Sequence, residues 1–137
     1  MHRRFLNVLA IAGMLTAAAL PAAAHHSFSA EFDASKPITL EGTVVKLEWV
    51  NPHSWLDIDV PKPDGTVEHW RLEGGSPGVL LRLGWNKNSL PPGTKIKVTA
   101  FQAKDGDFRG STREIEFPDG RKLGMGSSAT NKDGAEK

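Results

Sequence analysis

The chain has 137 residues, with 17 lysines and arginines against 16 aspartates and glutamates, and it contains no cysteine. Its length fits one small domain. A nearly balanced charge argues against a nucleic-acid-binding protein, which usually shows a basic excess. The lack of cysteine excludes disulfides, covalent haem attachment, iron–sulfur ligation and thiol catalysis. Any metal site must therefore use histidine, carboxylate or the chain terminus.

The first 24 residues have the three-part pattern of a secretory signal peptide. Two arginines give a positive start, residues 5–20 are mostly apolar, and an Ala-x-Ala site follows. The apolar segment is short for a membrane span, which needs about 20 residues. We expect cleavage after Ala24, export to the periplasm or beyond, and a mature protein that begins at His25 with no membrane span. Because the removed segment holds two arginines and no acid, the net charge changes from +1 to −1.

Residues 25–37 show no sustained periodicity and are predicted to form an N-terminal leader, with Phe28 and Phe32 as anchors on the domain. A long strand is predicted over residues 38–50, which are rich in β-branched side chains. Its apolar residues change parity near Gly42. This change predicts a β-bulge or bend at that glycine.

Two further strands are predicted over residues 54–60 and 66–73, joined by a hairpin turn that reads Pro-Lys-Pro-Asp-Gly. Alternation in the first of them directs one apolar set inward and leaves an outward set of Trp55, Asp57 and Asp59. His69, in the second strand, is expected to face Asp57 or Asp59 across the hairpin as a surface polar pair.

A short helix is predicted to follow, with Ser76 as its N-cap, Pro77 at its first position and Gly84 at its end. Later strands are expected over residues 95–102 and 109–117, with a short last strand over residues 121–125. Residues 127–137 are polar and predicted to be a disordered tail.

This order of elements predicts an all-β domain over residues 38–126. Three strands, a short helix, two strands and a sixth short strand follow the order of the oligonucleotide/oligosaccharide-binding (OB) fold, a small Greek-key barrel. A β-sandwich is the alternative, because periodicity alone does not separate the two.

Three local strings carry a resemblance to a known family. They are His25-His26-Ser27 after the signal, the Glu-Trp-Val-Asn-Pro-His run ending at His53, and a Gly-rich closing segment with a Phe-Pro-Asp-Gly-Arg hairpin. Together they resemble the DUF6152 family of small exported bacterial proteins of unknown function, over residues 25–126. The resemblance implies export and assigns no catalytic residue.

The mature N-terminus is a candidate metal site. The free amine and ring of His25 could chelate one metal, and the ring of His53 would complete a three-nitrogen histidine brace, which suits copper. Alternatively, His26 could bind through its ring and backbone nitrogen together with the amine, which needs no fold. We predict His25, His26 and His53 as candidate ligands of a divalent metal. The other interpretation is that these histidines bind nothing and that His53 packs on Trp55.

The second candidate site is a face with Trp55, Asp57 and His69, which would bind a small ligand or a protein without any metal. The four tryptophans are either a stacking platform or, for Trp49 and Trp70, part of the core. No catalytic motif is present. We therefore expect a binding module rather than an enzyme.

Overall fold

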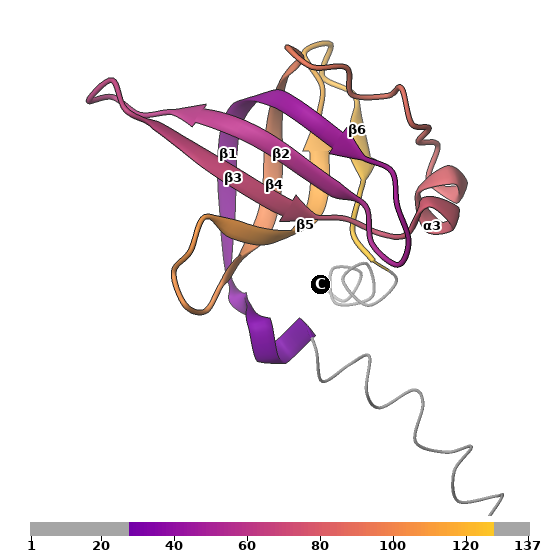
Figure 1. Ribbon diagram of the computed structural model, residues 1–137, viewed down its shortest axis with the longest axis horizontal. Coiled ribbons are helices and arrows are strands. Elements are labelled where there is room, and N and C mark those ends of the chain that lie inside the picture. Colours follow the sequence, from indigo (N-terminus) through magenta and orange to yellow (C-terminus); the bar gives the residue numbers. More distant parts are fainter. Residues whose placement is uncertain (1–27, 128–137) are drawn as a thin grey trace, which may run out of the picture. The chain divides into compact units, whose positions relative to one another are not determined.

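The computed structural model describes residues 28–127 (Figure 1). The predicted signal peptide, His25, His26 and residues 128–137 of the predicted tail lie outside the described residues. Residues 28–31 are helical and lead into the strands. The elements then follow in the order β1 (Phe32–Glu48), β2 (Trp55–Pro61), β3 (Val67–Glu73), α3 (Pro77–Arg82), β4 (Lys95–Ala103), β5 (Arg109–Glu116) and β6 (Lys122–Gly124). No helix among these residues is long and apolar enough to span a membrane.

All six strands belong to one sheet with the order β3-β2-β1-β4-β5-β6. The sheet closes into a ring because β3 also pairs, in parallel, with β5 at Arg71–Arg109, Leu72–Gly110 and Glu73–Ser111 (Figure 1). The five strands of the ring have the connectivity of an OB-like fold, with α3 between β3 and β4. The predicted all-β, OB-like class is therefore confirmed, and the sandwich alternative is wrong because there is one sheet.

The first strand begins earlier than its sequence predicts. Phe32 is buried and pairs with Ala103 of β4, so part of the predicted leader belongs to β1. The pairing register shifts between Phe32 and Pro37, over a polar stretch with no apolar alternation. Backbone pairing with β4 extends the strand there, and such pairing leaves no signature in the side chains.

The predicted β-bulge exists, but at Val45 rather than at Gly42. The register between β1 and β2 shifts between Val44 and Lys46, which leaves Val45 exposed. Gly42 serves a different purpose: a Cβ there would lie 2.7 Å from the backbone oxygen of Asp59. The glycine allows β1 and β2 to approach each other closely. After the bulge the odd-numbered residues of β1, rather than the even-numbered ones, point toward the core.

The predicted helix is confirmed with its caps. The Ser76 Oγ accepts a hydrogen bond of 3.3 Å from the Val79 N–H, and Gly84 has a φ of 92° after the last turn. Trp85 follows it into the core, where its indole N–H donates to the Gly124 carbonyl at 2.7 Å. Trp70 is also buried, as the core interpretation predicts, and Trp49 packs against the core from its edge.

Replacement of Gly42 by alanine should lower the free energy of unfolding by about 1–3 kcal/mol, because the added methyl group collides with backbone and cannot rotate away. The matched control is Gly78→Ala in α3, where the new Cβ meets only the end of Arg82 at 4.0 Å. That change should be neutral or stabilise by up to about 1 kcal/mol. Urea denaturation measures both, and equal stabilities would contradict the close approach at Gly42.

Candidate functional site

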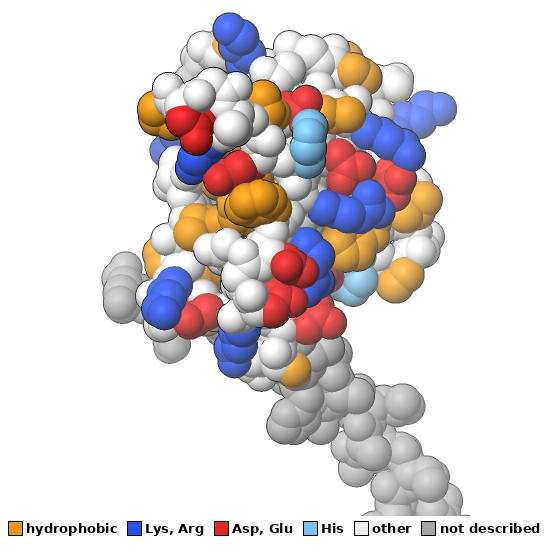
Figure 2. All heavy atoms as spheres, turned by 60° about the vertical axis from the view of Figure 1, so that its left-hand side comes forward, with side chains coloured by type: hydrophobic (Ala, Val, Ile, Leu, Met, Phe, Trp, Pro, Cys, Tyr) orange, Lys and Arg blue, Asp and Glu red, His pale blue; other side chains and the backbone are white. Residues whose placement is uncertain are grey.

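The outer surface of the β2–β3 hairpin carries three of the six predicted site residues, Trp55, Asp57 and His69. The register sets Trp55 opposite Glu73, Asp57 opposite Arg71 and Asp59 opposite His69. Strand alternation turns these six side chains to the outside, while their neighbours Leu56, Ile58 and Leu72 are buried. We call these six residues the hairpin face. Figure 2 shows a side of the molecule on which acidic and basic side chains adjoin and histidines reach the surface.

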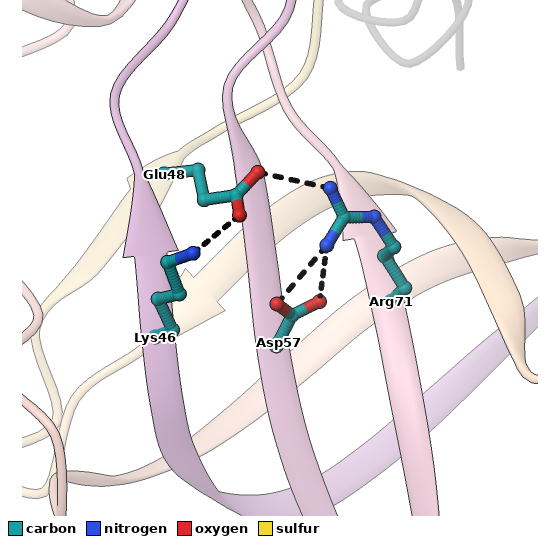
Figure 3. Close-up of polar contacts among 4 residues, drawn as sticks. All are labelled: Lys46, Glu48, Asp57 and Arg71. Carbon is teal, nitrogen blue, oxygen red and sulfur yellow. Dashed lines mark hydrogen bonds and ion pairs between the residues drawn. The ribbon is translucent and has the colours of Figure 1, made fainter.

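Arg71 is the centre of an ionic network on the hairpin face (Figure 3). Its Nη1 donates to both carboxylate oxygens of Asp57 at 3.1 Å, and its Nη2 donates to Glu48 Oε2 at 2.9 Å. The other Glu48 oxygen accepts from Lys46 Nζ at 2.5 Å. The hydrogen bonds from Lys46 and Arg71 lower the pKa of Glu48, while the bond to Glu48 raises the pKa of Arg71 further. The network therefore neutralises itself.

The indole of Trp55 is already stacked. The Arg71 guanidinium lies 4.9 Å from the Trp55 ring centroid, in the range of a cation–π contact. A base or sugar that stacked on this ring face would have to displace Arg71 from two carboxylates. Sequence reasoning did not single out Arg71, although its parity with His69 and its place opposite Asp57 could have pointed to it.

His69 and Asp59 form the predicted surface pair. His69 Nδ1 lies 2.6 Å from Asp59 Oδ1, and the His69 side chain is 79% exposed. An exposed pair of this kind contributes little to stability, since water screens it. Trp55, Asp57 and His69 thus share one face, as predicted, but Asp57 contacts Arg71 and not His69. Their role in binding a ligand stays a prediction.

His53 stands at the entrance to β2 and is held by the end of β3. Its Nδ1 lies 3.0 Å from Glu73 Oε1 and 3.3 Å from the Gly74 carbonyl oxygen. Both neighbours are acceptors, so the Nδ1 of His53 carries the proton and donates. In the neutral ring the other nitrogen, Nε2, then holds the lone pair, and none of residues 28–127 is hydrogen-bonded to it. The ring is partly exposed, with 40% of its side-chain surface accessible.

Glu73 sits in a more enclosed environment than the other carboxylates of the hairpin face. Burial raises the pKa of Glu73, the nearby His53 lowers it, and the carboxylate of Glu31 raises it. Glu31 therefore lies close enough to act on Glu73 electrostatically. Part of the predicted leader, at Glu31, therefore lies near Glu73, which contacts His53.

The described residues alone do not assemble a metal site. Among residues 28–127, no group of three or more histidine, aspartate or glutamate side chains is arranged to hold an ion. His53 is the one predicted metal ligand within this range. His25 and His26 lie outside it, so their predicted contact with His53 is untested.

Replacing Arg71 by methionine should raise the pKa of Glu48 toward its ordinary value, because one of its two hydrogen-bond donors is lost. A carboxyl group whose pKa is lower in the folded protein than in the unfolded chain stabilises the fold at pH values above its unfolded-state pKa. This stabilisation is lost as the pH falls through the pKa of the folded state. The variant should therefore lose less stability on acidification. Carbon-detected NMR titration of the Glu48 carboxyl measures the shift. Arg82→Met, in α3, should leave Glu48 unchanged, and an unchanged value in the Arg71 variant would refute the network.

Comparison with known proteins assigns the chain to a family without a described activity. No curated protein and no solved structure matches it significantly. The model of a family of unknown function, DUF6152, matches residues 12–113, which is most of the chain. The match includes the Asn-Pro-His turn, the hairpin face and the strands that close the ring. The chain therefore belongs to the DUF6152 family of unknown function.

Proposed function

We propose that the protein is an exported, non-enzymatic binding module whose mature N-terminus binds copper(II) together with His53. In this proposal the signal is cleaved after Ala24, and His25 contributes its amine and ring. His53 supplies the second imidazole. His26 lies beside them and offers a further ring nitrogen. The single observation that carries the proposal is the way in which His53 is held.

Metal-binding histidines commonly donate their second ring N–H to a carboxylate or a backbone carbonyl, which fixes the tautomer and orients the ring. His53 has both partners, since its Nδ1 faces Glu73 Oε1 at 3.0 Å and the Gly74 oxygen at 3.3 Å. When the ring is neutral, this leaves Nε2 as the nitrogen that can bind a metal. The Nε2 of His53 has no hydrogen-bond partner among residues 28–127, and the contacts of Nδ1 fix the orientation of the ring.

The position of Glu31 supports the same arrangement. Glu31 acts electrostatically on Glu73, and Glu73 contacts His53. Only three residues of the mature chain, His25 to Ser27, precede the helical turn at residues 28–31, and they span at most about 10 Å when extended. The proposal requires His25 to reach His53 through this short segment.

The available donors favour Cu(II) over Cu(I). Amine and imidazole nitrogens suit tetragonal Cu(II), whereas Cu(I) prefers thiolate and thioether sulfur. The chain has no cysteine, and Met125, the methionine of the described region, is fully buried. Reference pKa values of about 7.7–8.0 for the amine and about 6.5 for imidazole allow both groups to lose their protons near neutral pH.

Copper(II) titration of the protein that begins at His25 should show one tight site. Acetylation of the N-terminal amine removes that nitrogen as a ligand, and His53→Ala removes the second imidazole. Each change should weaken binding by more than the roughly tenfold typical of an outer-shell substitution. His69→Ala is the matched control and should bind as the parent does, because His69 lies with Asp59 farther along the hairpin. Calorimetry in the presence of a competing chelator measures the affinities.

N-terminal sequencing of the exported protein should read His-His-Ser before any titration is interpreted. Equal affinity after acetylation would remove the terminal amine from the site. Equal affinity in His53→Ala would leave only the fold-independent chelate at His26. Either result contradicts the proposed brace.

Replacement of Glu73 by glutamine tests the carboxylate that positions His53. The amide is a weaker acceptor, so copper affinity should fall by about tenfold while the set of ligand nitrogens is kept. Electron paramagnetic resonance should therefore show unchanged nitrogen couplings in Glu73→Gln and one coupling fewer in His53→Ala. Glu41→Gln, on an exposed part of β1, is the control. Parental affinity in the Glu73 variant would show that the carboxylate does not position the ring.

A further inference from the structure

A second feature lies at the opposite end of β2 from His53 and is independent of the proposed metal. A cavity of about 430 Å³ opens on the surface where β4 begins and β5 ends. The cavity is lined by residues 41–43 of β1, residues 95–97 of β4, the last residue of β5 with the two that follow it (116–118), and Pro61 of β2. Its volume is within the range of about 300–1,000 Å³ that is usual for small-molecule sites.

The cavity exists because β1 and β2 separate there. Thr43–Asp59 is the last pair between the two strands, and beyond it β1 pairs only with β4. Strand β2 continues instead as the hairpin with β3, as far as the pair Pro61–Val67. Pro61 forms one apolar wall of the resulting opening. Phe117 and Pro118 form another.

The polar groups of the cavity are paired except for one cation. Lys97 binds Glu41 at 3.1 Å, and Glu116 binds Lys122 at 3.3 Å. Lys95 has no acidic partner among residues 28–127. Directly opposite Lys95 in the sheet is Thr43, whose hydroxyl lies on the same face. A free ammonium and a neighbouring hydroxyl therefore adjoin apolar walls.

We propose that this cavity binds a small organic carboxylate that carries an aromatic or short aliphatic group. The Lys95 ammonium and the Thr43 hydroxyl bind the carboxylate, since charge-assisted hydrogen bonds are the strong ones. Pro61, Phe117 and Pro118 contact the apolar part and shield it from water. A neutral ligand of the same shape fits the walls but gives up the interaction with Lys95.

Benzoate and hexanoate are the probes, with benzamide as the neutral match for benzoate. Proton–nitrogen NMR spectra of the exported protein, recorded with a metal chelator present, should show saturable benzoate shifts centred on Thr43, Ile96 and Phe117. Benzamide should bind at least about fivefold more weakly, as expected when a partly shielded charged contact is lost. The chelator keeps the outcome separate from the copper proposal.

Lys95→Gln should weaken benzoate binding by at least about fivefold, whereas Lys87→Gln should not change it. Both positions are exposed and both changes remove one charge, but Lys87 lies in the segment after α3 and does not line the cavity. The benzamide comparison needs no variant and stands if Lys95→Gln fails to fold. Absence of saturable shifts with both carboxylates, equal affinity for benzoate and benzamide, or equal affinity of the two variants would each overturn the proposal.

Discussion

The parallel pairing between β3 and β5 is the constraint on which the structure depends. Three residue pairs join the two strands, and the Arg71 N–H donates to the Phe108 carbonyl at 3.0 Å just before them. The closure requires a small residue: a Cβ at Gly110 would lie 3.2 Å from Leu72 Cδ2 and from the Phe101 carbonyl oxygen. Closing the sheet pairs strand edges that would otherwise be open, and it encloses one continuous core.

The same closure explains why charge collects on the hairpin face without leaving it open for ligands. Arg71 takes part in the closing pairs through its backbone, and its side chain turns outward toward Asp57 and Glu48. Its guanidinium also covers the Trp55 ring. An OB-like ring often binds ligands on this face. In this chain Arg71 instead covers the ring of Trp55. The two candidate binding sites lie at the two ends of β2.

At one end of β2, His53 is held by Glu73 and the Gly74 carbonyl oxygen, and its Nε2 is directed away from these partners. At the other end, Pro61 borders the cavity beside Lys95. The two features differ in chemistry, since one offers an imidazole nitrogen and the other an ammonium group beside apolar walls. The DUF6152 family has no described activity, so binding experiments on this protein are the direct test of both features.

Local patterns predicted the elements of this protein well. Alternation identified β2 and β3, the Ser-Pro pair marked the start of α3, and the order of elements indicated the OB-like class. These features succeed because neighbouring residues decide them. The predicted surface pair also followed from parity and hairpin geometry, which set His69 opposite Asp59.

Contacts between residues distant in sequence decided the rest. The bulge at Val45, the early start of β1 at Phe32 and the covering of Trp55 by Arg71 depend on which strand lies beside which. The contact between Glu73 and His53 joins the end of β3 to the residues before β2, and no spacing in the sequence predicts it. Composition and local pattern thus determined the candidate ligands and the class of fold. Only the tertiary structure decided which of those side chains already have partners, because the pairing of β1, β2 and β3 sets the distances between them.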